Sequence, residues 1–114
     1  MVLSAAVVAA EEMRSDLMQE IEDANKSLSS NIALSNKPAS TTDAKELTRM
    51  FAEVEAHFDR KGEARNAVDL ARQSKGLATE IVGLVDKGDF AAASAASTNL
   101  SRTCRTCHTF YKKE

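Results

Sequence analysis

The feature that most constrains this chain is a pentapeptide near its C-terminus, Cys104-Arg105-Thr106-Cys107-His108, which has the form C-x-x-C-H. Two cysteines at this spacing lie on one side of a helical turn, so each thiol can add to one vinyl group on the same edge of a porphyrin. The adjoining His108 can then offer an imidazole nitrogen to the iron. The chain has no other cysteine and only one other histidine. The motif predicts one covalently attached haem c, with Cys104 and Cys107 as thioether anchors and His108 as proximal iron ligand.

Three other interpretations of the motif stay open at the level of sequence. A redox C-x-x-C pair would normally follow a strand in a βαβ unit, and no strand pattern precedes this one. A zinc site would require Cys104, Cys107, His108 and His57 to converge, although adjacent Cys107 and His108 are poorly placed to share one tetrahedral ion. The two thiols could also form a disulfide if haem were never attached. Covalent haem is the interpretation we favour.

The composition is consistent with a small domain filled by a cofactor. We treat residues 1–114 as a single domain. Hydrophobic residues make up 43% of the chain but aromatic residues only 4%, so few large side chains can fill a core. A buried porphyrin would supply the missing apolar volume. The net charge of −2 gives no electrostatic reason to expect nucleic-acid binding.

Hydropathy and cofactor chemistry bear on location. No apolar run is long enough to span a bilayer. Residues 2–10 (VLSAAVVAA) are similar to part of a signal sequence, but no Lys or Arg precedes them, so we interpret them as the first turns of a helix. Because haem c is attached outside the cytoplasmic membrane, we expect a periplasmic protein.

Apolar residues recur at steps of three and four in four segments, which predicts four helices and no strand. Residues 35–42, which contain the only proline, are expected to form a loop, with Thr41 or Thr42 capping the second helix. Gly88 should end the third helix and Asp89 should cap the fourth. Similar helix lengths and short connections predict an all-α fold, an antiparallel up-down-up-down four-helix bundle of left-handed twist with haem c near the C-terminal helix. The expected helices are Ser4–Leu34, Asp43–Arg60, Glu63–Lys87 and Phe90–Lys113.

Each expected helix has an apolar stripe that should face the core. The stripe of the first helix also supplies the residues expected near the haem. The stripes comprise Met13, Leu17, Ile21, Ala24, Leu28 and Ile32 in the first helix; Leu47, Met50, Phe51, Val54 and Phe58 in the second; and Ala67, Leu70, Ala71, Ser74, Leu77, Ala78, Ile81, Leu84 and Val85 in the third.

Four helices with C-x-x-C-H on the last resemble the class II c-type cytochromes, the cytochrome c′ family. Members typically continue the motif as x-x-aromatic-basic, which Tyr111 and Lys112 match here. They often carry, in the first helix, an Arg followed four positions later by a large apolar residue that faces the iron. Arg14 and Met18 stand in that relation, so the resemblance extends over essentially the whole chain. Members are often dimers through the first two helices, which makes a homodimer a further expectation.

The resemblance implies that a first-helix residue covers the distal face of the haem. In cytochromes c′ proper it blocks the sixth position without bonding, which leaves five-coordinate iron able to bind NO or CO. In low-spin relatives a methionine binds the iron, which favours electron transfer. Met18 is the distal candidate, with Met13 and Leu17 as neighbours, and core packing is the alternative role for a methionine here. His57, at the edge of the second stripe, is the other candidate ligand.

Basic residues complete the expected site. The resemblance puts Lys112 over the proximal side of the ring, where it would tune the histidine; the alternative is a solvated lysine that suits the helix dipole. Arg14, Arg102 and Arg105 could pair with haem propionates, and Arg14 is the best placed of the three.

Together these features predict a periplasmic one-electron carrier rather than an enzyme, with an unidentified redox partner protein. The alternative is a five-coordinate cytochrome c′-type protein that binds small gases. A peroxidase is poorly supported because the first helix offers no histidine as an acid–base group.

Overall fold

The computed structural model describes the backbone of residues 2–61 and 65–111, and the side chains of residues 17–60 and 66–104. These residues form four helices, and no strand occurs among them, so the all-helical prediction is confirmed. The helices are α1 (Val2–Ala33), α2 (Lys37–Lys61), α3 (Arg65–Asp86) and α4 (Phe90–Tyr111).

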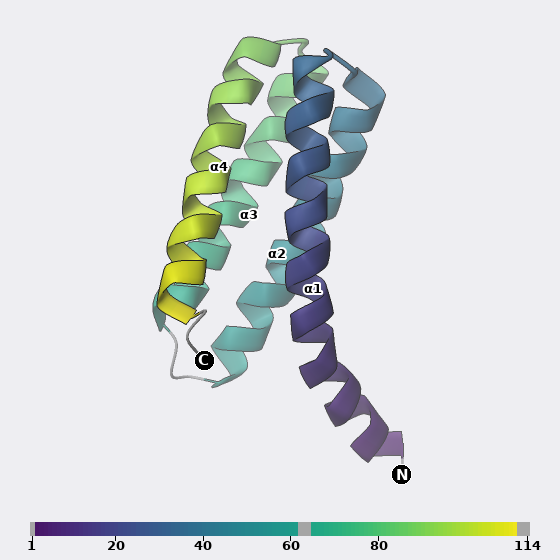
Figure 1. Cartoon of the computed structure of the whole chain (residues 1–114), viewed down its shortest axis with the longest axis vertical. Coiled ribbons are helices and arrows are strands. Elements are labelled where there is room, and N and C mark those ends of the chain that lie inside the picture. The colour runs from purple at the N-terminus through teal and green to yellow at the C-terminus, as the bar shows by residue number, and fades with distance from the viewer. Residues whose placement is uncertain (1, 62–64, 112–114) are drawn as a thin grey trace.

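The four helices pack side by side as a bundle (Figure 1). Each helix packs on two others, in the cyclic order α1, α2, α3, α4 and back to α1. The α2–α3 interface is the most extensive of the four and the α1–α4 interface the least extensive. The α1–α2 and α3–α4 turns lie at the upper end of the bundle in this view, while the end of α2 and the start of α3 lie at the lower end.

The core comes from the apolar stripes of the helices, because burial of one face per helix is what drives a bundle together. In the described part of α1, four stripe residues are buried and Ala24 is half-buried. All five expected residues of α2 are buried, and α3 buries most of its stripe. On α4 the small residues Ala93, Ala96 and Ser97 and the larger Leu100 are buried. The side chains that are most completely enclosed are Leu28, Leu47, Met50, Ile81, Leu100, Val85 and Ser40.

The start of α2 differs from the sequence prediction. We expected a loop over residues 35–42 and a helix from Asp43, but α2 begins at Lys37. The Asn36 side chain caps the helix, since its Oδ1 accepts a hydrogen bond of 3.2 Å from the Ala39 N–H. Pro38 falls in the first turn, where its missing N–H costs nothing because no intrahelical acceptor exists there. The proline therefore starts the helix instead of marking a loop, and Thr41 and Thr42 are not the cap.

The chain leaves α1 and α3 through the same kind of turn. At the end of α1, Ser35 adopts a left-handed φ of 54°, and the Asn36 N–H donates to the carbonyl of Asn31 at 2.9 Å. At the end of α3, Gly88 has φ of 78°, and the Asp89 N–H donates to the carbonyl of Leu84 at 2.9 Å. These bonds satisfy carbonyl groups that the helix end would otherwise leave without a donor.

The start of α4 follows the prediction. Asp89 Oδ1 accepts a hydrogen bond of 3.1 Å from the Ala92 N–H, so Asp89 is the cap and Gly88 the stop signal. The two short turns hold each pair of sequential helices in close register.

Candidate functional site

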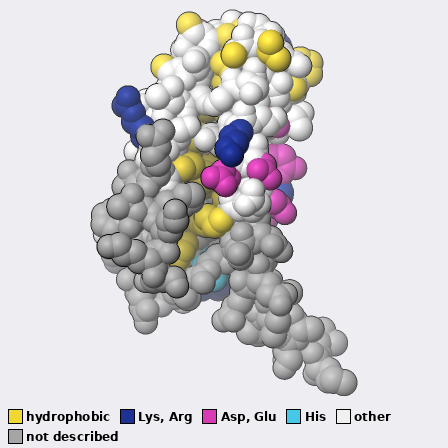
Figure 2. Space-filling view, viewed as in Figure 1, with side chains coloured by type: hydrophobic (Ala, Val, Ile, Leu, Met, Phe, Trp, Pro, Cys, Tyr) yellow, Lys and Arg dark blue, Asp and Glu magenta, His cyan; other side chains and the backbone are white. Residues whose placement is uncertain are grey.

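A cavity of about 20 Å³ lies between the four helices, and each helix contributes at least one lining residue. Two of its lining residues were predicted from the sequence to serve haem binding, namely Met18 on α1 and Cys104 on α4. The other walls are Ile21 of α1, Phe51 and Val54 of α2, and Leu70, Ala71 and Ser74 of α3. In Figure 2 hydrophobic side chains are visible in the depression between α4 and α1, and charged side chains lie above it and to its right.

Met18 and Cys104 are both half-buried and pack against the hydrophobic core. Their side chains contain a thioether and a thiol, and the other lining residues of the cavity are mostly apolar. A thiol can form the covalent link of haem c, and a methionine sulfur is one of the axial ligands used in c-type cytochromes. The fold therefore brings Met18 of α1 and Cys104 of α4 to the same cavity. A haem attached at Cys104 and covered by Met18 would require this proximity.

The residues around this cavity fit a haem in their chemistry. Apolar walls favour burial of a porphyrin face, and Cys104 is the first cysteine of the motif. A volume of about 20 Å³ holds roughly one water molecule. Accommodating a porphyrin would therefore require lining side chains such as Met18 or Leu70 to move outward.

Several predicted site residues lie outside the described side chains. Cys107 and His108 belong to α4 and Arg14 belongs to α1, but only their backbone is described. The same holds for Met13 and Arg105, while Lys112 lies outside the described residues altogether. Leu17 is described: it is 5% exposed, belongs to the core and is not among the residues that line the cavity.

His57 is half-buried on α2, and its ring meets the ring of Phe58 edge-on, with centroids 5.1 Å apart and planes at 83°. It follows the cavity residue Val54 by three positions, which is slightly less than one helical turn. The C-terminal half of α2 thus contributes to the cavity. His57 is not itself a lining residue of the cavity.

An open groove of about 460 Å³ runs between α3 and α4 beside the cavity. Leu70 lines both spaces. Arg102, one of the candidates for pairing with a propionate, lies on the α4 wall of this groove and is exposed. The complete lining is Leu70, Gln73, Leu77, Asn99, Arg102 and Thr103.

Small polar residues join α1 to α4, a feature that the sequence analysis missed. Asn25 Nδ2 donates a hydrogen bond of 2.9 Å to Ser101 Oγ. One turn further along α1, the hydroxyls of Ser29 and Ser97 are 3.2 Å apart. The available sequence signal was the spacing of four residues in each helix, which puts each pair of polar residues on one face.

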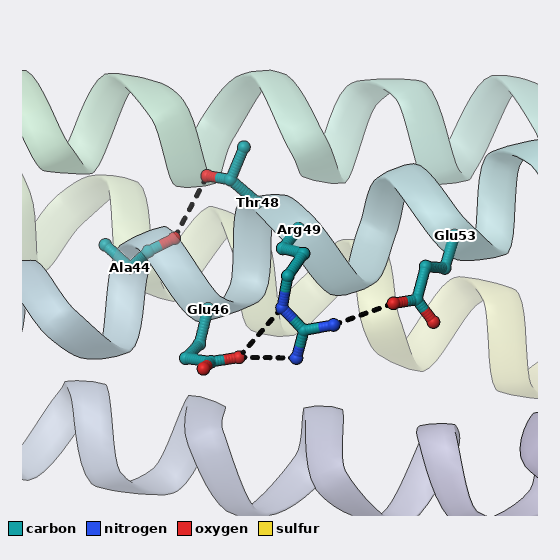
Figure 3. A network of polar contacts seen from close by, with 5 residues as sticks. All are labelled: Ala44, Glu46, Thr48, Arg49 and Glu53. Atoms are coloured by element: carbon teal, nitrogen blue, oxygen red, sulfur yellow. Dashed lines mark hydrogen bonds and ion pairs between the residues drawn. The ribbon is translucent and has the colours of Figure 1, made fainter.

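Ion pairs on the outer faces brace the helices but do not line the cavity. Glu55 of α2 accepts hydrogen bonds from Lys75 Nζ at 2.7 Å and Arg72 Nε at 3.0 Å, both on α3. The bonds from Lys75 and then Arg72 lower the pKa of Glu55 below 4.5. Arg49 lies between Glu46 and Glu53 on the surface of α2 (Figure 3), and the hydrogen bond to Glu46 raises the pKa of its guanidinium.

The described residues were also compared with the requirements of a membrane-spanning helix and of a metal site. None of their helices is both long enough and apolar enough to cross a bilayer. No group of three or more His, Cys, Asp or Glu side chains within the described part of the chain is arranged to hold a metal ion.

Comparison of the chain with protein-family models, curated proteins and solved structures finds no match in any of the three.

Proposed function

We propose that the protein is a haem c protein of the cytochrome c′ type that carries single electrons. The haem would be attached through Cys104 and Cys107, with His108 as proximal ligand and Met18 as distal ligand. The bound group supplies the reversible one-electron chemistry of its iron. The chain supplies the anchors, the axial ligands and an apolar surrounding that keeps water from the iron.

The observation that carries the proposal is the cavity shared by Met18 and Cys104. These residues come from the first and last helices, and the sequence analysis selected each of them for haem binding by a separate motif. Any bundle of this connectivity brings the start of α1 and the end of α4 to the same end, so the specific finding is that these two side chains line one cavity. Packing of Met18 against the core is compatible with this role, because a distal ligand must also be buried.

The register between α1 and α4 supports Met18 as the distal ligand. Residue numbers rise along α1 and fall along α4 from the Asn25–Ser101 pair to the Ser29–Ser97 pair, which favours an antiparallel arrangement of these helices. Met18 precedes Asn25 by seven residues, and His108 follows Ser101 by seven residues. Seven helical residues advance about 10 Å in each case. In an antiparallel pair, Met18 and His108 would therefore lie at the same level of the bundle.

Binding of a small gas such as NO or CO is the second candidate function. The position of Met18 on the lining of the cavity supports it, because displacement of this flexible side chain would open space for a diatomic molecule. In that case Met18 would cover the iron without a bond and could be displaced. The two functions differ in one property of the chain, namely whether the Met18 sulfur binds iron.

Attachment of haem c would place the mature protein in the periplasm, and electron transfer would require a redox partner protein. A homodimer through α1 and α2 belongs to the same proposal by resemblance to the family.

The test is to express the chain in a host that matures c-type cytochromes, then to measure its mass under denaturing conditions and its visible spectrum in the oxidised and reduced states. The expected mass is that of the chain plus one haem. Sharp low-spin bands in the reduced protein, together with a methionine–iron charge-transfer band in the oxidised protein, would indicate the carrier. High-spin bands that shift on addition of CO would indicate the gas-binding protein. A colourless chain with the mass of the bare polypeptide would overturn both.

A further inference from the structure

We propose that Asn25 is a positioning residue that holds Met18 over the haem, an inference that rests on the proposed function. Asn25 does not line the cavity. It acts through its hydrogen bond of 2.9 Å to Ser101, which fixes the position of α1 along α4. Met18 is carried on the same helix as Asn25, and Cys104 on the same helix as Ser101.

The spacing of these residues makes the bond effective. Asn25 lies two helical turns from Met18, so the two side chains project from similar faces of α1. Ser101 lies just under one turn before Cys104 on α4. A shift of α1 by one turn would break the bond and move Met18 by about 5 Å relative to Cys104. Such a displacement is larger than an iron–sulfur bond could tolerate.

The limited packing between α1 and α4 explains why a hydrogen bond is needed to fix their relative position. Packing between α1 and α4 is the least extensive of the four helix interfaces. The side chains that join these helices by hydrogen bonds are short and polar, so they offer little interdigitation to resist sliding. One polar contact of defined geometry can set the register of a helix pair, as a single buried asparagine does in coiled coils.

The amide oxygen of Asn25 gives a second observation that supports this role. Asn25 Oδ1 is buried and has no hydrogen-bond partner among the described residues. A buried acceptor without a donor lowers stability, so an apolar residue at this position would be expected to stabilise the bundle. The register that Asn25 specifies would account for a polar residue at this position.

The experiment compares Asn25→Ala, Asn25→Leu and Ser101→Ala with a matched control, Ser29→Ala combined with Ser97→Ala. The control removes the other polar pair of the same interface, one turn further from Met18. Each haem-loaded protein carries isotope-labelled methionine methyl groups, and NMR records the Met18 methyl, whose resonance is shifted strongly by a nearby haem. Met50, which is 2% exposed in the core and does not line the cavity, serves as the internal reference.

Loss of one partly buried hydrogen bond should shift the equilibrium between placed and displaced Met18 by about fivefold. We expect this shift in all three test variants, with Met50 unchanged and with Asn25→Leu at least as stable as the parent protein toward urea. Ser101→Thr, which keeps the hydroxyl, should restore the parent spectrum. Normal haem loading with a Met18 resonance that is unchanged in the test variants, or equally changed in the control, would overturn this inference alone. A parent chain that loads no haem would overturn the proposed function and this inference together.

Discussion

Met18 of α1 and Cys104 of α4 line one cavity, although they stand near opposite ends of the sequence. Neither motif predicts the other: C-x-x-C-H concerns attachment of a haem, and the first-helix methionine concerns its distal face. Their meeting is a property of the fold. It makes Met18 the residue whose replacement distinguishes electron transfer from gas binding.

Replacement of Met18 by alanine should convert a low-spin protein into a high-spin one that binds CO. The physical reason is that alanine has no atom able to bind iron and leaves space over the distal face. Visible and near-infrared spectra of the purified variant provide the measurement.

The matched control for this change is Met50→Leu, which alters a buried methionine outside the cavity. It should leave the spectrum unchanged and cost less than about 1.5 kcal/mol of stability. A Met18→Ala protein that keeps its low-spin spectrum would remove Met18 as a ligand.

Replacement of both Cys104 and Cys107 by alanine should abolish covalent haem. Either single replacement should leave one thioether, so haem remains linked but in lower yield. Mass spectrometry under denaturing conditions separates these cases. Full covalent loading of the double variant would show that other residues hold the haem.

Replacement of Gly88 by alanine should lower the free energy of unfolding by about 1 kcal/mol, because alanine resists the left-handed conformation at φ of 78°. Nothing lies within 4 Å of the position that a Cβ would take, so the cost would come from the backbone alone. Urea denaturation measures the change.

Gly83 is the control for that substitution. It lies inside α3 and also has nothing within 4 Å of an added Cβ. Alanine there should raise stability by roughly 0.5–1 kcal/mol through helix propensity. Equal effects at the two glycines would contradict the role assigned to φ.

Replacement of Glu55 by glutamine should lower stability at pH 7 by roughly 0.5–1 kcal/mol, since Arg72 and Lys75 are partly exposed and solvent screens both pairs. Folding lowers the pKa of Glu55 below 4.5 through the bonds from Lys75 and Arg72. The stabilisation is therefore present above pH 4.5 and is lost as the pH falls through the lower pKa of the folded state. Parent and variant should unfold at the same urea concentration once Glu55 is protonated. A difference that persists below that pH would assign the effect to packing.

Helix number and the buried faces were predictable because apolar spacing alone determines them. The α2 stripe from Leu47 to Phe58 illustrates this, since every expected residue is buried. The first helical residue of α2 was not predictable by the same means. Proline suits either a loop or a first helical turn, and only the hydrogen bond from Ala39 to Asn36 decides between them.

The candidate site likewise contains residues that could be predicted from the sequence and residues that could not. Met18 and Cys104 could be selected from local patterns because each belongs to a motif. Ile21 and Leu70 line the same cavity, but in the sequence they are stripe residues like many others. The Asn25–Ser101 contact depends on the register of two helices that are distant in sequence, and no local pattern specifies that register.

The unequal helix interfaces also bear on the order in which the chain becomes structured. The broad α2–α3 interface connects neighbours in sequence, so this hairpin can form with little loop-closure entropy. Amide hydrogen exchange should find its protons the slowest to exchange, with α1 opening at lower free energy. Uniform protection of all four helices would contradict this order. If haem c is attached as we propose, the α2–α3 hairpin would already be stable when the attachment machinery reaches α4.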